Sequence, residues 1–103
     1  MSKYRNIKTN GYSSKKEAYR AQALKILEKS GHITDLREQV PFIIIPAVVI
    51  NGRKSCARKY IADFVYIEDG KQVVEDCKGF KTEMYRIKRH LMKSVHGIDI
   101  LET

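Results

Sequence analysis

The stretch that decides the fold is residues 60–79, YIADFVYIEDGKQVVEDCKG. Residues 60–67 are rich in aromatic and β-branched side chains, which are typical of strands. Residues 71–78 follow after Asp69 and Gly70, and an Asp-Gly pair between two such runs is the strongest short-range signal for a tight hairpin turn. We therefore predict a β-hairpin with these two arms.

Both arms of this hairpin carry carboxylates at interior strand positions: Asp63 on the first, and Glu75 and Asp76 on the second. Side chains alternate along a strand, so Asp76 and Lys78 should share a face, about 6.6 Å apart at roughly 3.3 Å per residue. Charged side chains are depleted from strands and are rarely buried unless they are paired. A divalent-metal site would explain this cluster, and the solvated face of an edge strand is the plainer alternative.

The length of 103 residues predicts one domain with one modest core, and a hydrophobic fraction of 43% favours folding over disorder. The most apolar run, residues 42–50, contains Pro46 and is too short to span a membrane. Residues 1–16 lack the apolar segment of a secretory signal. Two cysteines without C-x-x-C spacing are typical of reduced thiols. We expect a cytoplasmic protein (the host's cytoplasm, for a phage-encoded one) with no membrane partner.

The charge is strongly basic, with 20 Lys and Arg against 12 Asp and Glu, a net charge of +8. Such a charge is typical of a protein that binds a polyanion, because basic side chains displace the counterions of a phosphate backbone. The alternative is a basic protein of the ribosome or a membrane surface. Residues 1–13 read as a flexible basic arm that touches DNA, or as a disordered terminus. Residues 14–103 read as the single domain.

A first helix is predicted over residues 15–29. Ser14 is a good N-cap, Glu17 completes a capping box, and Gly31 follows the helix end. Glu17 has two interpretations that helix geometry leaves open: a capping residue, or a third carboxylate of the metal site. Helical spacing predicts an apolar stripe facing the sheet, formed by Tyr19, Ala23, Ile26 and Leu27.

The middle of the chain predicts further antiparallel strands. Residues 36–45 read as a strand broken by Pro41, and residues 47–50 turn back at Asn51 and Gly52, a second hairpin signal. Short connections make these strands neighbours in one sheet.

A second helix is predicted over residues 82–95, with Thr82 as N-cap and Gly97 after its end. Its expected core stripe is Met84, Ile87, Leu91, Met92 and Val95. A basic stripe is either a solvated face or a track for a phosphate backbone, and it consists of Arg86, Arg89, His90 and Lys93. Residues 98–101 read as a last short strand. The predicted class is α+β, a mixed, mainly antiparallel β-sheet flanked by two helices.

Three motifs follow one another along the chain: an acidic residue in a helix, an aspartate in a strand, and a D-x-K sequence after which glycine follows. They are Glu17 in SKKEA, Asp63 in YIADF, and Asp76 with Lys78 in VVEDCKG. This order resembles the PD-(D/E)XK nuclease superfamily. The likeness is greatest to the small phage junction-resolving endonucleases of the endonuclease I type and to a group of phage-encoded nuclease-like proteins. It spans residues 12–100 and departs at Ala62, where the family has proline.

The resemblance implies a restriction-endonuclease-like core with Glu17, Asp63, Asp76 and Lys78 as catalytic residues. It implies Mg²⁺ or Mn²⁺ held through oxygen by Asp63, Asp76, the Cys77 carbonyl and Glu17. Lys78 would position or deprotonate the attacking water and offset charge in the transition state. Asp76 is preferred to its neighbour Glu75 because it shares a face with Lys78, whereas Glu75 should point the other way.

The function implied is a metal-dependent DNA endonuclease, structure-selective for branched or junction DNA, without a small-molecule cofactor. Paired cuts need two sites, so a homodimer is expected. The alternatives are a non-catalytic DNA-binding module on the same fold and a basic scaffold that binds RNA or a protein. The candidate contacts to nucleic acid are Lys15, Lys16, Lys81, Arg86, Arg89 and Lys93.

Overall fold

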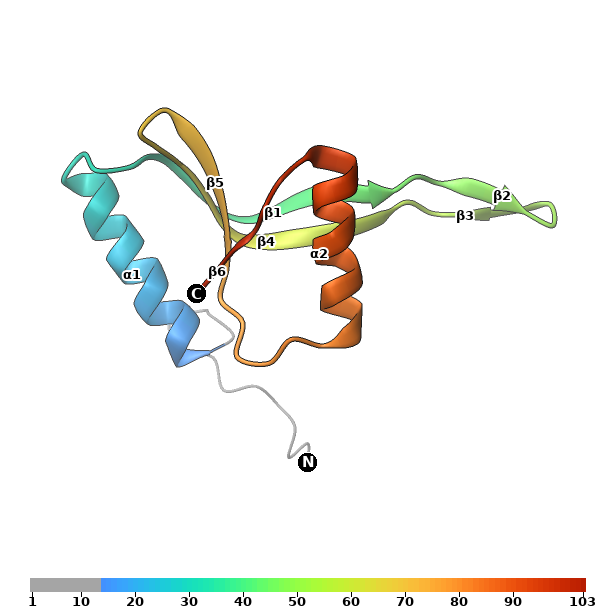
Figure 1. Cartoon of the computed structure of the whole chain (residues 1–103), viewed down its shortest axis with the longest axis horizontal. Coiled ribbons are helices and arrows are strands. Elements are labelled where there is room, and N and C mark those ends of the chain that lie inside the picture. The colour runs from blue at the N-terminus through green and yellow to red at the C-terminus, as the bar shows by residue number, and fades with distance from the viewer. Residues whose placement is uncertain (1–13) are drawn as a thin grey trace.

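The computed structural model describes residues 14–103, so the basic arm predicted over residues 1–13 lies outside the described part. The protein is α+β, as predicted, with two helices and a mainly antiparallel mixed sheet (Figure 1). The elements in chain order are α1 (Lys15–Lys29), β1 (Thr34–Ile45), β2 (Val48–Ile50), β3 (Arg53–Ser55), β4 (Arg58–Glu68), β5 (Lys71–Asp76), α2 (Glu83–His96) and β6 (Leu101–Glu102).

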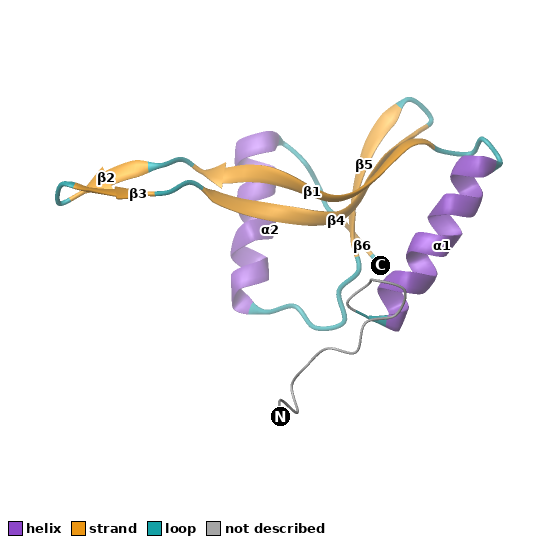
Figure 2. Ribbon diagram, turned by 180° about the vertical axis from the view of Figure 1, so that it is seen from behind, coloured by secondary structure: helices purple, strands orange, loops and turns teal. Residues whose placement is uncertain are grey.

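The main sheet has four strands in the order β1-β4-β5-β6. The β1–β4 and β4–β5 pairs are antiparallel, and β6 is parallel to β5. Strands β2 and β3 form a separate two-stranded sheet that extends away from the body, and the view from behind shows the two helices against different parts of the main sheet (Figure 2).

Both predicted hairpin turns are present. Asn51 and Gly52 have φ values of 49° and 77°, and Asp69 and Gly70 have φ values of 52° and 76°. Positive φ at both central residues is the geometry of a type I′ turn, which matches the right-handed twist of the flanking strands. The central hairpin therefore forms between β4 and β5, where the sequence predicted it.

Four strand predictions need correction. The strands were expected to be neighbours in one sheet, but within residues 14–103 β2 and β3 pair only with each other. Strand β1 is continuous through Pro41, which lies opposite Ile61, because β1 is an edge strand and one of its sides needs no backbone donor. The last strand is β6, later than residues 98–101, since pairing with β5 determines where it forms. Strand β5 ends at Asp76, so Lys78 lies beyond the strand.

Helix α1 begins and ends as predicted, with the Ser14 side chain accepting from the Glu17 N–H. Its predicted apolar stripe is wrong at Tyr19 and Ile26, which are 69% and 61% exposed, whereas Leu27 packs against the core. The buried face instead carries Glu17, Ala18, Ala21 and Leu24. Alanines on this face let the helix approach the sheet closely. Leu24 and Ala21 pack with Ile33, Phe64 and Tyr66.

Helix α2 has the predicted caps, Thr82 and Gly97. The predicted stripe is correct at Met92, which is buried, and at Leu91, which packs against the core. It is wrong at Met84, Ile87 and Val95, which are exposed, and it omits the buried Tyr85. Tyr85 takes a core position because its hydroxyl reaches Glu102 at 2.7 Å. The second core cluster lies here and comprises Ile44, Tyr60, Ala62, Val65, Val74, Tyr85 and Met92. No helix within residues 14–103 is long and apolar enough to cross a bilayer.

Candidate active site

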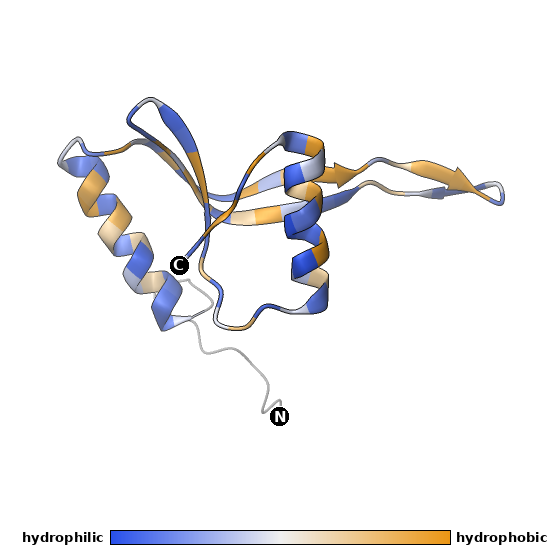
Figure 3. Ribbon diagram, in the orientation of Figure 1, coloured by the Kyte–Doolittle hydropathy of each residue, from blue (hydrophilic) through white to orange (hydrophobic). Residues whose placement is uncertain are grey.

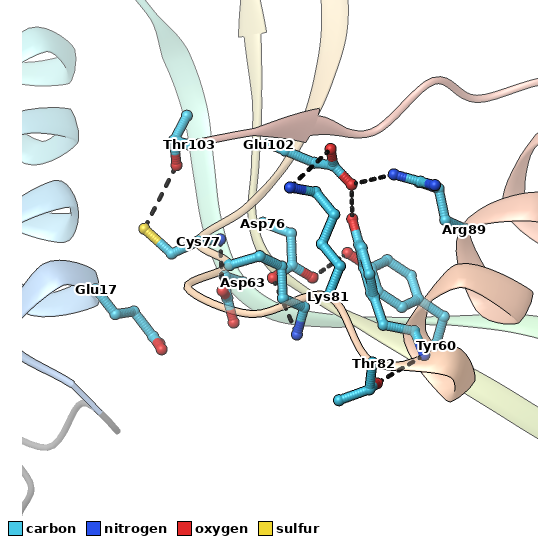
Figure 4. Close-up of polar contacts among 12 residues, drawn as sticks. Glu17, Tyr60, Asp63, Asp76, Cys77, Lys81, Thr82, Arg89, Glu102 and Thr103 are labelled. Atoms are coloured by element: carbon cyan, nitrogen blue, oxygen red, sulfur yellow. Dashed lines mark hydrogen bonds and ion pairs between the residues drawn. The ribbon is translucent and has the colours of Figure 1, made fainter.

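The hairpin register brings two of the predicted carboxylates together. Phe64 pairs with Glu75, so the next positions, Asp63 and Asp76, lie opposite each other on adjacent strands. Glu17 lies in the first turn of α1 and projects toward Asp63 (Figure 4). Three carboxylates from α1, β4 and β5 thus face one region of the molecule.

Asp76 is almost fully buried, with 1% of its surface exposed. Its Oδ2 accepts a hydrogen bond from the Tyr60 hydroxyl. Its Oδ1 lies 3.4 Å from Lys78 Nζ, an ion-pair distance, but has no hydrogen-bond partner within residues 14–103. A buried carboxylate oxygen without such a partner is costly and calls for a functional explanation.

Asp63 is held by backbone and side-chain donors. Its Oδ2 accepts from the Cys77 N–H at 2.9 Å, and its Oδ1 lies 3.4 Å from Gln39 Nε2. Burial, together with the nearby Asp76 and Glu17 carboxylates, raises the pKa of Asp63 to about 7, although the hydrogen bond from the Cys77 N–H lowers it in part. Carboxylates crowded in this way are typical of a functional site.

Lys78 completes the cluster. Its Nζ lies 3.4 Å from Asp76 Oδ1 and 4.7 Å from the centroid of the Tyr85 ring. Its backbone is held from two sides, because its N–H donates to Thr103 O at 3.3 Å and its carbonyl accepts from Lys16 Nζ at 3.4 Å. The predicted proximity of Asp76 and Lys78 is therefore present, but a loop after β5 produces it rather than strand alternation.

Gln39 is a site residue that the sequence analysis missed. It lies opposite Asp63 in the β1–β4 register, with a φ of 53° in the middle of a strand. Its Nε2 lies 3.3 Å from Glu17 Oε2 and 3.4 Å from Asp63 Oδ1, so one amide group bridges two carboxylates. Only the register between β1 and β4 could have pointed to it.

Two tyrosines were also missed. Burial, followed by the hydrogen bond to Asp76, raises the pKa of Tyr60 well above its ordinary value, so its hydroxyl stays protonated and donates. Tyr85 donates to Glu102, and this bond lowers the pKa of Glu102, helped by Arg89 at 2.9 Å. Both tyrosine rings line the Lys78 side of the site, 6.5 Å apart between centroids.

Glu75 has a structural role. It is fully buried, accepts two hydrogen bonds from Arg20 at 2.5 and 2.9 Å, and accepts others from Tyr66 and Thr103. These partners are different from those of Asp76, in line with the expectation that the two adjacent acids point to opposite sides. Glu75 fastens α1 to the sheet.

Some of the cations expected to contact nucleic acid are paired with carboxylates of the protein itself. Lys81 and Arg89 lie 3.9 and 2.9 Å from Glu102, and Lys93 lies 2.8 Å from Asp99. The predicted basic stripe does share one face, since its four residues line a common pocket. The pocket is lined by Arg86, Arg89, His90, Lys93, Ile98, Asp99, Ile100 and Glu102. Acidic neighbours neutralise part of that face, so α2 is a weaker phosphate track than predicted. Lys15 and Lys16 lie in the first turn of α1, with Lys16 bonded to the Lys78 carbonyl.

The donor set fits a hard divalent cation, although within residues 14–103 no three His, Cys, Asp or Glu side chains form a ready-made cation cage. The fit rests on the buried Asp76 Oδ1, which has no hydrogen-bond partner among the described residues, and on the crowding that raises the pKa of Asp63. Carboxylate oxygen is the ligand type that Mg²⁺ prefers, and Mg²⁺ keeps several waters and needs few protein ligands. Glu17 and the Cys77 carbonyl stay predicted ligands.

Fold and site together define an α+β protein with a carboxylate–lysine cluster beside its central hairpin. The family model described as "Protein of unknown function (DUF1064)" matches residues 1–98, so the chain belongs to this family. No curated protein and no solved structure matches the chain.

Proposed function

We propose that this chain is a metal-dependent DNA endonuclease of the PD-(D/E)XK type that acts on branched DNA. One observation carries the proposal: Asp63 and Asp76 lie opposite each other beside Lys78, and Asp76 Oδ1 is buried without a hydrogen-bond partner among the described residues. The resemblance to junction-resolving endonucleases supports the preference for branched substrates. The net charge of +8 supports a polyanionic substrate.

Each side chain has a role in this proposal. Asp63 and Asp76 would hold Mg²⁺ or Mn²⁺, which when bound would supply an activated water and a Lewis acid for the phosphate. Tyr60 fixes the orientation of Asp76 by donating to its Oδ2. Lys78, held over the Tyr85 ring, orients the attacking water and offsets the charge that develops on the phosphate. Gln39 keeps Glu17 and Asp63 at a constant separation.

The test is cleavage of labelled duplex, flap and four-way junction DNA with Mg²⁺, Mn²⁺ or EDTA. D76N is compared with D99N, a matched change at an exposed aspartate bonded to Lys93. We expect metal-dependent cutting of branched DNA by the wild type and by D99N, reduced at least about a hundredfold in D76N.

Two outcomes would contradict the proposal. If D76N cuts as fast as the wild type, the site assignment is wrong. If the wild type binds branched DNA tightly but cuts no substrate with either metal, the chain is a non-catalytic DNA-binding module.

A further inference from the structure

The charge of the chain is unevenly distributed. Between Glu38 and Asp63, residues 39–62 contain no carboxylate and four cations: Arg53, Lys54, Arg58 and Lys59. Within residues 14–103, none of these four forms an ion pair or a side-chain hydrogen bond. The ion-paired cations all lie outside this stretch, namely Arg20, Lys25, Arg37, Lys78, Lys81, Arg89 and Lys93.

Two of the free cations lie on the β2–β3 ribbon, residues 48–55, which extends away from the body of the molecule (Figures 1 and 3). Val49 lies opposite Lys54, and Ile50 lies opposite Arg53. Residues paired in this way share a face, so each face of the ribbon combines an aliphatic side chain with a cation. All of β2 is exposed, with Val49 at 72%.

The other two cations connect the ribbon to the proposed active site. Lys59, Lys78 and Lys88 line one groove between β4 and the start of α2. A second groove shares Lys59 and Lys88 and adds Arg58, at the base of the ribbon. A series of cations therefore leads from Lys78 along α2 and β4 to the ribbon.

We propose that this groove and the β2–β3 ribbon form a DNA-binding surface in which duplex DNA leaving the active site lies along the groove and receives the ribbon in its major groove. This inference rests on the proposed function, which identifies the bound polyanion as DNA. A major groove about 12 Å wide admits a two-stranded ribbon, aliphatic side chains contact thymine methyl groups, and unpaired cations contact phosphates.

A second copy of this chain is a poorer occupant of the ribbon. Pairing two ribbons would bring Arg53 and Lys54 against their own copies, with no carboxylate in residues 39–62 to offset them. Like charges placed together oppose association. DNA supplies the missing negative charge.

The test is the salt dependence of binding to a four-way junction in EDTA, where metal-dependent cutting does not interfere. The variants are R53Q/K54Q on the ribbon and R58Q/K59Q in the groove. The matched control is K29Q/K71Q, which removes two exposed lysines at the ends of α1 and of the central hairpin. Thermal melts verify that all variants fold.

Log K falls as log salt rises, and each ribbon or groove variant should make this slope shallower by about 1.8, at roughly 0.9 per lost phosphate contact. Between about 50 and 200 mM salt, its affinity should therefore fall roughly tenfold less than that of the wild type. The control should keep the wild-type slope.

Wild-type slopes in both test variants would overturn the inference even if the protein cuts DNA. Lowered slopes in a protein that never cuts would support the surface and refute the nuclease proposal. Unchanged slopes with a changed sedimentation coefficient in R53Q/K54Q would make the ribbon an interface between copies, and the inference would be wrong.

Discussion

At the scale of single residues, the backbone of Gln39 is the most informative feature. Among the described non-glycine residues with positive φ, Asn51 and Asp69 lie in turns and Asp35 lies near the start of β1, whereas Gln39 lies in mid-strand. A left-handed conformation costs about 1–2 kcal/mol for an ordinary residue. Such strain is concentrated at functional sites. Here it aims an amide group at Glu17 and Asp63.

Comparison of Q39G with Q39A separates this strain from the chemistry. Both variants remove the amide, but glycine adopts a φ of 53° freely and alanine does not. We expect Q39G to be about 1 kcal/mol more stable than Q39A in urea unfolding, with an equal loss of cleavage, about tenfold or more, in both. Full activity in either variant would remove Gln39 from the site.

A pH prediction follows from Asp63. Its pKa of about 7 in the folded protein lies above the ordinary value of an aspartate in an unfolded chain. Its contribution to the free energy of unfolding is therefore complete below about pH 4 and is lost as the pH rises through about 7. In EDTA at about pH 8.5, D63N should melt at a higher temperature than the wild type, and this gain should shrink toward about pH 4.

Melting the same two proteins with Mn²⁺ tests metal binding separately from their stability in EDTA. Mn²⁺ at about pH 8.5 should raise the melting temperature of the wild type and leave D63N unchanged, because a ligand that binds only the folded state stabilises it. An equal rise in both proteins would place the cation elsewhere.

At the scale of elements, α1 is attached to the sheet by the buried Glu75 and the Arg20 guanidinium. Removing one partner of a buried pair leaves an uncompensated charge. R20A should therefore lower the free energy of unfolding by about 3 kcal/mol, measured in urea. K25A, which removes the exposed Lys25–Glu38 pair at 3.9 Å, is the control and should cost less than about 1 kcal/mol.

A double variant tests whether the unpaired charge of Glu75 causes this loss of stability. Replacing both partners by apolar residues, as in R20M/E75L, removes the unpaired charge and should recover most of the loss. If R20A is as stable as the wild type, Glu75 does not depend on Arg20, and the account of α1 docking is wrong.

At the scale of the whole molecule, residues 14–103 of one chain offer one carboxylate–lysine cluster, so paired cuts across a junction need two copies. An equal mixture of wild type and D76N tests this. If the active form is a dimer that exchanges subunits, the mixture should give singly nicked junctions in excess of those from the wild type alone. Gel analysis of the products measures this. A mixture that yields only paired cuts, at half the rate, would contradict an exchanging dimer.

The sequence by itself determined the features that local chemistry controls. Ser14 and Thr82 begin the helices, Gly31 and Gly97 follow their ends, and Asp69 with Gly70 turns the central hairpin. Each depends on a few neighbouring residues, so α1, α2 and the two hairpin turns were predicted nearly to the residue. The proximity of Asp76 to Lys78 was predicted from strand alternation, but a loop after β5 produces it.

Tertiary structure decided the features that depend on contacts between residues distant in the chain, such as the buried helix faces and the partners of the site residues. The buried faces of both helices coincide with the apolar stripes only in part, at Leu27, Leu91 and Met92. They differ elsewhere because Arg20 must reach Glu75 and Tyr85 must reach Glu102. Gln39 meets Asp63 only through the β1–β4 register. The cations of the β2–β3 ribbon stand free because no acid folds back onto them within the described residues. Side-chain partners are set by register and packing between elements, and the local pattern of a sequence does not contain that information.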